Sequence, residues 1–388
     1  MTAESILFAL LRTAVCGEKR NYGVLVECTP EKLSEVYALA NQHDLAHLAG
    51  YALEGVELPR CAVLAKFKEA KAQAIYRYMR QNFEFEQVCS VLDAADLSYI
   101  PLKGAVLRCY YPEAWMRTSA DIDILVKEEN LDDAVSELKD KLRYTGSRKS
   151  DHDYSLYSKS GVHLELHYDT VEQRYAEERR RSILADIWHR TYPESAEKKK
   201  HLMPDDLFYF YYAAHLAKHF ETGGCGIRAI LDVWIMNHRM QHNREARESL
   251  LQKGGLLPFM KVIEQVAEAW FSGGEMDALA QQVGEYILRG GVYGNEENRA
   301  AFGQAKTGGK WRYLITRRVF MPYDYLKAEY PILKKYKWLT PMYQIVRWGR
   351  MLSAGKVKRY LREIRSNILT QNKIRKDAEK LLRQLELK

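Results

Sequence analysis

Two aspartates separated by one residue open an apolar run, Asp121-Ile-Asp-Ile-Leu-Val126. In an extended chain, residues two positions apart share one face, so Asp121 and Asp123 would lie together while the isoleucines point to the other side. Two carboxylates this close repel each other unless a cation neutralises them, and oxygen ligands are those that Mg²⁺ prefers. The pair is therefore a candidate metal-binding and catalytic site.

A third carboxylate follows in residues 162–168, Val-His-Leu-Glu-Leu-His-Tyr. Strict alternation puts Glu165 on one face, between His163 and His167, and the leucines on the other. If this strand lies beside the first, Glu165 joins the two aspartates on an open sheet face. Three carboxylates on two neighbouring strands suit a two-metal site for phosphoryl transfer. The two histidines are then either a base or acceptor contacts, or structural histidines.

A Lys-Gly pair precedes the aspartates. Residues 97–102 form a short apolar run that predicts a strand, Lys103 and Gly104 follow, and residues 105–111 are typical of a helix. A strand that ends in Gly at a helix start presents backbone N–H groups to an anion, and Lys103 adds a positive charge there. We expect phosphate at this turn. Arg117 could be a second cation, for a triphosphate or for charge on the transferred group.

Taken together, these segments resemble the bacterial uncharacterised nucleotidyltransferase family, part of the polymerase-β-like nucleotidyltransferase superfamily. The resemblance rests on Pro-Leu-Lys-Gly, Tyr-Pro, Arg117, Asp-Ile-Asp-Ile-Leu-Val and Leu-Glu-Leu-His, and extends through residues 215–219 to Tyr-Pro and Arg-Trp segments near 330–350. It implies a metal site and a phosphate-facing turn: Asp121 and Asp123 as metal ligands, Glu165 as the third carboxylate, and Lys103 with Gly104 as the turn. The wider superfamily usually has Gly-Gly or Gly-Ser at that turn.

Two histidines, His215 and His219, lie four residues apart on one expected helix, which is the spacing of two zinc ligands. The glutamate of a zinc protease and a third ligand are missing, so an ordinary pair of helix-face histidines is favoured over metal binding. A role at the cleft stays open, in which Lys218, His219 or Arg228 contacts phosphate or the acceptor. Asp232 could orient one of these basic groups.

The strands and helices expected around these residues indicate an α+β fold. It has a small mixed sheet with helices on one face, flanked in the sequence by N-terminal and C-terminal helical regions. Between residues 96 and 172 the order is β, α, β, α, β, β, with a helix over 130–142 capped by Asn130 and a hairpin turn at 159–161. The expected division is a helical region (1–95), the nucleotidyltransferase core (96–172), a helical domain (173–354) and a basic helical tail (355–388).

The length of 388 residues suggests two or three domains, and 47% hydrophobic with 28% charged residues is ordinary for a globular protein. No segment approaches 18 consecutive apolar residues, so we expect no membrane span. The N-terminal apolar run carries an acid where a signal peptide needs a positive charge, which favours a cytoplasmic protein. Six cysteines without C-x-x-C spacing argue against a zinc ribbon.

The net charge of +8 is concentrated at the C-terminus, where residues 355–388 hold eleven Lys and Arg against four acids. A solvated basic helix is the favoured interpretation, and an anionic partner, nucleic acid or a membrane surface, is the alternative. Residues 323–348 mix Tyr, Trp, Lys and Arg. This stretch could bind the acceptor or a membrane surface, but a buried helical cap is the favoured interpretation.

The sequence thus predicts an Mg²⁺-dependent nucleotidyltransferase that binds a nucleoside triphosphate, with two metal ions, and transfers a nucleoside monophosphate to an acceptor with release of pyrophosphate. The acceptor could be a small molecule, RNA or a protein. Two other classes stay open: a non-catalytic nucleotide or phosphate sensor on the same fold, and a nucleic-acid-associated protein that uses its basic tail.

Overall fold

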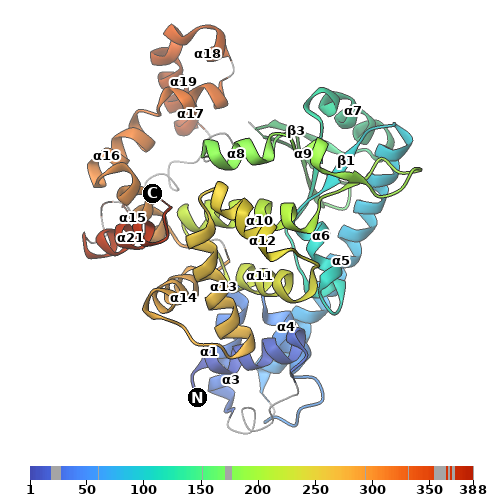
Figure 1. Cartoon of the computed structure of the whole chain (residues 1–388), viewed down its shortest axis with the longest axis vertical. Coiled ribbons are helices and arrows are strands. Elements are labelled where there is room, and N and C mark those ends of the chain that lie inside the picture. The colour runs from blue at the N-terminus through green and yellow to red at the C-terminus, as the bar shows by residue number, and fades with distance from the viewer. Residues whose placement is uncertain are drawn as a thin grey trace.

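The computed structural model describes residues 1–18, 28–59, 61–150, 152–170, 177–292, 294–330, 332–353, 364–365, 368 and 372–387. Figure 1 shows the N-terminal helices at one end, the sheet and its helices to one side, long helices in the centre, and a protrusion built from α17, α18 and α19. Most of the first half of the expected basic tail lies outside the described residues. Its last part forms α21 (Asn372–Gln384), which packs against α15 (Glu296–Thr307).

A five-stranded mixed sheet carries the candidate carboxylates. Its strands are, in spatial order, β1 (Tyr99–Pro101), β2 (Asp121–Val126), β5 (His163–His167), β4 (Asp153–Tyr157) and β3 (Thr145–Lys149). β2 and β5 run parallel, and the other neighbouring pairs are antiparallel. In the β2–β5 register Asp123 lies opposite Glu165 and Asp121 opposite His163. The predicted α+β class and the adjacency of the two strands are confirmed.

The covered face of the sheet packs on α5 (Ala62–Ala94) and α7 (Leu131–Leu142). β2 and β5 alternate as the sequence predicts, so their apolar side chains enter one core while the carboxylates point the other way. Burying one such aliphatic side chain stabilises the fold by about 1.5–3 kcal/mol. This core fixes which face the carboxylates occupy, and its buried members include Val88, Leu92, Ile122, Ile124, Val126, Leu138, Leu164 and Leu166.

The helix expected over residues 105–111 is present as α6 (Gly104–Leu107), which continues into the 3₁₀-helix η2 (Arg108–Tyr110). Two other local expectations for this region are wrong. Asn130 precedes α7, but its side chain makes no capping hydrogen bond, since the 3₁₀-helix η4 (Glu128–Asn130) leads into the helix. The edge strand β3 is absent from the predicted order, because its residues, Thr-Gly-Ser-Arg-Lys, show no apolar alternation.

Helical segments precede and follow the sheet in the sequence, as expected. Before β1 come α1 (Ala3–Leu11), the π-helix η1 (Arg12–Cys16), α3 (Pro30–Gln42), α4 (Ala46–Ala52) and α5. After β5 come α8 (Glu178–Leu184), α9 (Ile187–Arg190), the two-stranded β6 (Tyr192–Pro193) and β7 (His201–Leu202), α10 (Asp205–Glu221), α11 (Ile227–Arg239), α12 (Arg244–Lys253), α13 (Leu257–Ser272), α14 (Ala278–Gly290) and α15.

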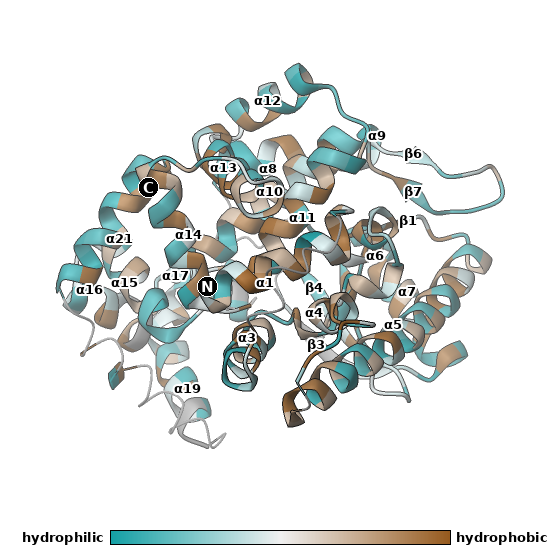
Figure 2. Ribbon diagram, turned by 90° about the horizontal axis from the view of Figure 1, so that it is seen from below, coloured by the Kyte–Doolittle hydropathy of each residue, from teal (hydrophilic) through white to brown (hydrophobic). Residues whose placement is uncertain are grey.

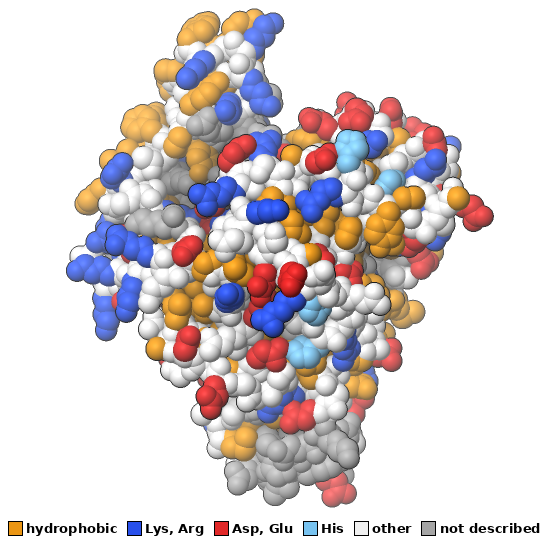
Figure 3. Space-filling view, in the orientation of Figure 1, with side chains coloured by type: hydrophobic (Ala, Val, Ile, Leu, Met, Phe, Trp, Pro, Cys, Tyr) orange, Lys and Arg blue, Asp and Glu red, His pale blue; other side chains and the backbone are white. Residues whose placement is uncertain are grey.

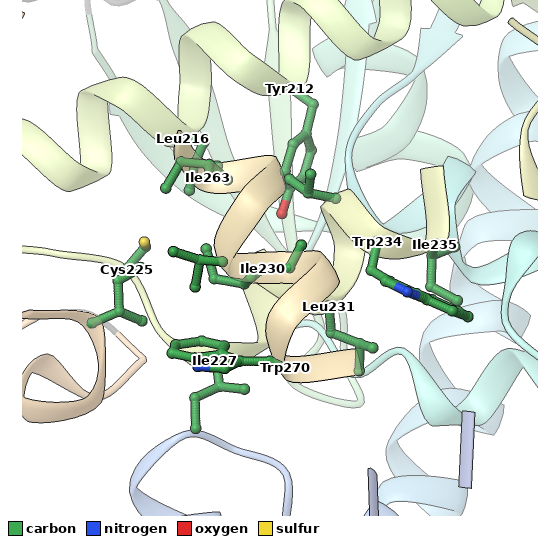
Figure 4. Packing of buried hydrophobic residues seen from close by; sticks show 14 of the residues in the cluster. Tyr212, Leu216, Cys225, Ile227, Ile230, Leu231, Trp234, Ile235, Ile263 and Trp270 are labelled. Atoms are coloured by element: carbon green, nitrogen blue, oxygen red, sulfur yellow. The ribbon is translucent and has the colours of Figure 1, made fainter. Parts of the chain in front are cut away.

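The main hydrophobic core lies where α10, α11 and α13 meet (Figure 4). Tyr212 and Leu216 enter it from α10, Ile230 and Leu231 from α11, and Ile263 from α13. Figure 2 shows α11 largely in hydrophobic colours, whereas α21 at the edge of the molecule is largely hydrophilic. The central helices are therefore a rigid body against which the open face of the sheet is placed.

The last helices are α16 (Lys310–Leu314), the π-helix η5 (Ile315–Val319), α17 (Tyr323–Glu329), α18 (Ile332–Lys335), the 3₁₀-helix η6 (Lys337–Leu339) and α19 (Thr340–Ser353). α17 to α19 form a small core of their own around Leu326, Tyr330 and Leu333. The expectation of a buried cap over residues 323–348 is wrong for much of the stretch, since Trp338 is 76% exposed and Ile345 64% exposed.

Candidate active site

Asp121, Asp123 and Glu165 line one cavity of about 360 Å³ between the open face of the sheet and the helices α10 and α11. Two groups of potential metal ligands share Glu165: Asp121 with His163, and Asp123 with His167. Within each group the ligand atoms lie within 4.8 Å of one another. Carboxylate and imidazole donors at this spacing fit a divalent cation.

Asp123 is the most enclosed of the three acids, at 3% exposed. Its Oδ1 accepts a hydrogen bond from Lys103 Nζ at 2.6 Å and lies 2.9 Å from His167 Nε2. Burial alone would raise the pKa of Asp123, but Lys103 and His167 outweigh it and hold that pKa well below its usual range. Asp123 is therefore ionised at neutral pH.

Asp121 has the opposite tendency. Burial and the charges of Asp123 and Glu165 raise its pKa to about 6, against the smaller influence of Lys103. The repulsion predicted from the sequence is thus real, since two ionised neighbours disfavour a third negative charge. A divalent cation at this place would remove the penalty.

Glu165 and His167 stabilise each other's charge. His167 Nε2 lies 3.5 Å from Glu165 Oε2. Burial opposes ionisation of both groups, but this contact and the nearby Lys103 lower the pKa of Glu165, and the contacts with Asp123 and Glu165 raise the pKa of His167. His167 is thus a charge partner of the carboxylates, whereas Nε2 of His163 is buried without a hydrogen-bond partner and the ring stacks on Tyr157.

The turn before α6 places Lys103 in the cavity. Lys103 has a left-handed φ of 44°, and Gly104 packs so closely that a Cβ there would lie 3.2 Å from Ser119 Cβ. Arg108 ties the two segments together, with Nε donating to Gly104 O and a terminal nitrogen to Ser119 Oγ. At the turn that was expected to bind phosphate, the Lys103 ammonium forms an ion pair with Asp123. The helix α6, which begins at this turn, has only four residues.

Arg117 also lines the cavity, and its guanidinium is bound by the carboxylate of Asp232. Arg117 Nε donates to Asp232 Oδ1 at 2.7 Å, and the hydroxyls of Tyr111 and Tyr212 donate to the same carboxylate at 2.7 and 2.8 Å. Burial acts against the charge of Arg117, but the Asp232 carboxylate outweighs it and raises the arginine pKa. Asp232 thus positions Arg117, a pairing that the sequence did not indicate.

The helical wall opposite the sheet carries the remaining expected residues: His215, Lys218 and His219 from α10 and Arg228 from α11. Nε2 of His215 and Nε2 of His219 lie 2.9 Å apart. Burial and the nearby cations lower the pKa of His215 well below its usual value and that of His219 to about 4. Both rings are neutral at pH 7, so one donates a hydrogen bond to the other.

A fourth acid shares the sheet face. Asp153, 7% exposed, lies opposite His167 in the β4–β5 register and lines the same cavity beside His152. Its position two residues before Ser155, which pairs with Glu165, is the signal that could have placed it there.

Residues 29–272, more than half of the chain, match the model of a family described as uncharacterised nucleotidyltransferase. The chain belongs to this family. It is therefore a nucleotidyltransferase enzyme, as the sequence motifs predicted, and the matched region spans the sheet, the cavity and the helices α10 and α11. Comparison with curated proteins and with solved structures finds no similar chain.

Proposed function

We propose that this nucleotidyltransferase takes a nucleoside monophosphate from a nucleoside triphosphate and transfers it, with Mg²⁺, to an acceptor oxygen, releasing pyrophosphate. The observation that carries the proposal is the common face of Asp121, Asp123 and Glu165, on two parallel strands inside one cavity. Three carboxylates face one lysine and the imidazole of His167 there, so the wall keeps an excess of negative charge that suits divalent cations.

The metal would be held by Asp121, Asp123 and Glu165. When bound, Mg²⁺ supplies charge neutralisation of the phosphates and activation of the attacking oxygen. Lys103 is close enough to neutralise Asp123, and His167 hydrogen-bonds Asp123 and lies 3.5 Å from Glu165 Oε2, which fixes the orientation of both carboxylates. In this account Glu165 helps to deprotonate the acceptor.

The triphosphate would lie against the helical wall. Lys103 and Gly104 approach it from the sheet side, and Arg117, Lys218 and His219 from the other. Arg117 is pre-positioned by Asp232, so it can contact a phosphate without losing its own partner. Neutral His219 contributes a hydrogen bond rather than a charge.

The acceptor would enter through a second cavity of about 450 Å³, which shares Ala120 and Val292 with the first. Polar side chains line it, including Asn41, Asp44 and Arg77. Because the shared residue Ala120 directly precedes Asp121, an acceptor in the second cavity would bring its oxygen to the metal-binding face while the nucleotide occupies the first cavity.

Thermal-shift measurements test this proposal with ATP, GTP, CTP and UTP, each with and without Mg²⁺. A triphosphate at about 100 times its dissociation constant stabilises the native state by about 2.7 kcal/mol. We expect a Mg²⁺-dependent shift in the wild type that is lost in Asp121→Ala/Asp123→Ala and kept in Asp140→Asn, an exposed aspartate on α7. The same shift in wild type and double variant would refute the assigned site.

One observation favours a second candidate, a nucleotide sensor without turnover. Oδ1 of Asp123 already has two partners, Lys103 Nζ and His167 Nε2, which compete with a metal for this oxygen. A sensor would show the thermal shift but release no pyrophosphate with any acceptor, whereas the enzyme would do both.

A further inference from the structure

The helix α19 packs on α17 and on residues 319–321 through Tyr343, Gln344 and Arg347, and it presents aliphatic side chains to solvent. Gln344 and Arg347 are buried, at 7% and 6% exposed. Their side chains hydrogen-bond the backbone of Met321 and Val319, so they hold α19 in this orientation. Ile345, between them in sequence, is 64% exposed. A surface helix usually buries its aliphatic side chains, so their exposure on α19 is unusual.

The exposed apolar side chains form a continuous stripe. Trp338 on η6 is 76% exposed, and Met342, Ile345 and Val346 on α19 are 48%, 64% and 40% exposed. Spacings of four, three and one residues place these four on one side of a helical path. We call residues 338, 342, 345 and 346 the apolar stripe. Large apolar side chains exposed in a contiguous row mark an interaction surface.

Cations border the stripe and acids are missing from its part of the sequence. Between Tyr330 and Arg362 the chain has nine Lys and Arg and no Asp or Glu. Lys334, Lys335 and Lys337 are exposed immediately before Trp338. Figure 3 shows hydrophobic side chains interspersed with Lys and Arg on the protruding module. The surface is therefore complementary to a partner that is apolar inside and negatively charged outside.

We propose that this module docks the enzyme on the surface of an anionic lipid bilayer. Trp338 and the aliphatic members of the stripe would enter the boundary between headgroups and acyl chains, where indole rings are favoured, while the lysines contact anionic headgroups. A nucleic acid would match the lysines but not the exposed isoleucine and methionine. No helix among the described residues is long and apolar enough to cross a membrane, and a bilayer-surface mode requires none.

The surface is separate from the enzymatic region. The family match ends at residue 272, and Figure 1 shows α17, α18 and α19 projecting away from the helices that carry the matched region. Docking through the apolar stripe therefore leaves the carboxylate cavity out of the contact, and the proposal holds whatever nucleotide or acceptor the enzyme uses.

Vesicle co-sedimentation of the full chain tests the proposal. We expect binding to phosphatidylcholine vesicles that contain about one third phosphatidylglycerol, at least about tenfold weaker binding to pure phosphatidylcholine, and release in about 0.5 M NaCl. Trp338→Glu/Ile345→Glu should reduce binding to the anionic vesicles at least about tenfold, since charges on the stripe cannot enter the interface.

The matched control is Tyr76→Glu/Phe83→Glu on α5, where both residues are also more than 60% exposed. This variant should bind vesicles as the wild type does. Circular dichroism and the melting temperature should be unchanged in both variants, because all four residues are exposed. No binding to anionic vesicles would overturn the proposal, as would equal binding by the stripe variant. A stripe-dependent dimer in light scattering, or stripe-dependent RNA binding without vesicle binding, would also overturn it.

Discussion

The two walls of the active-site cavity balance their charges differently. On the sheet wall, Asp121, Asp123 and Glu165 share one ammonium, that of Lys103, and the imidazole of His167. Around the helical wall the guanidiniums are paired with carboxylates, because Arg117, from the segment before β2, pairs with Asp232 and Arg228 shares Asp44 with Arg77. The wall's two histidines, His215 and His219, are neutral at pH 7.

This difference indicates which wall balances the charge of the substrate. The sheet wall has negative charge in excess and is ready for a cation, whereas the arginines and histidines of the helical wall carry little uncompensated positive charge. We therefore expect the phosphate charge of the substrate to be balanced mainly by metal ions on the sheet wall. The helical wall then orients the substrate through hydrogen bonds.

The largest effect is expected on the sheet wall. Asp123→Asn removes the carboxylate that Lys103 and His167 both contact, and should lower turnover about 10³-fold or more, measured as pyrophosphate release. The fold should be retained, as checked by circular dichroism, and Asp140→Asn should have wild-type turnover. Turnover near the wild-type value in Asp123→Asn would show that the carboxylates do no chemistry.

On the helical wall the largest effect should be on stability. Asp232 is fully buried and accepts hydrogen bonds from Arg117 and two tyrosines, so Asp232→Asn leaves a buried guanidinium without its counter-charge. We expect a loss of about 3–5 kcal/mol in the free energy of unfolding, measured by urea denaturation. The exposed Asp186→Asn is the control. A loss below about 1 kcal/mol would mean that the ion pair does not hold this wall together.

A smaller effect should follow from Glu165→Gln. This change keeps the shape and one hydrogen-bond acceptor but removes one of the three negative charges, so we expect turnover to fall about 10- to 100-fold. Half-maximal activity should also require a higher Mg²⁺ concentration. If turnover falls while the Mg²⁺ requirement is unchanged, Glu165 acts on the acceptor and does not hold metal.

Asp121 and His219, on opposite walls, should respond to pH in opposite directions. The native pKa of His219 is lowered to about 4 from an ordinary value of 6.5, so its stabilising contribution is present above pH 6.5 and is lost as pH falls toward 4. The native pKa of Asp121 is raised to about 6 from 3.8, so its contribution is present below pH 3.8 and is lost as pH rises through 6.

The smallest expected effect concerns His219. His219→Gln keeps a hydrogen bond to His215 but cannot titrate, so it should remove about 2 kcal/mol of the stability difference between pH 7 and pH 5. Urea denaturation at the two pH values measures it. Asp121→Asn should change the same difference in the opposite sense, and an equal pH dependence in wild type and His219→Gln would contradict the assigned neutral state.

The sheet wall was predictable because its signal is local and periodic. Alternation in residues 121–126 and 162–168 placed the acids on one face and the aliphatic side chains on the other, and the hairpin turn fixed where β5 begins. The edge strand β3 was missed because its polar residues do not alternate. Its Gly146, at φ 136°, lies where a Cβ would clash with Ser155 O, and a register shift follows.

The helical wall and the C-terminal module were less predictable, since their arrangement depends on tertiary contacts. Arg117 and Asp232 are 115 residues apart, and no local pattern links them. The amphipathic pattern of α19 is visible in the sequence, but a pattern does not tell which face is covered. Here Gln344, Arg347 and part of Tyr343 are covered while Met342 and Ile345 are exposed, so the expectation of a buried helical cap is wrong for this part of the chain.

The most direct test of the central claim is Mn²⁺ binding followed by electron paramagnetic resonance, with Mn²⁺ as the stand-in for Mg²⁺ at oxygen ligands. The wild type and Asp140→Asn should bind Mn²⁺ in the presence of the preferred nucleotide. Asp121→Asn/Asp123→Asn should bind it at least about 100-fold more weakly, because two of the three carboxylates are gone. Equal Mn²⁺ affinity in the wild type and the double variant would contradict a metal site on the β2–β5 face.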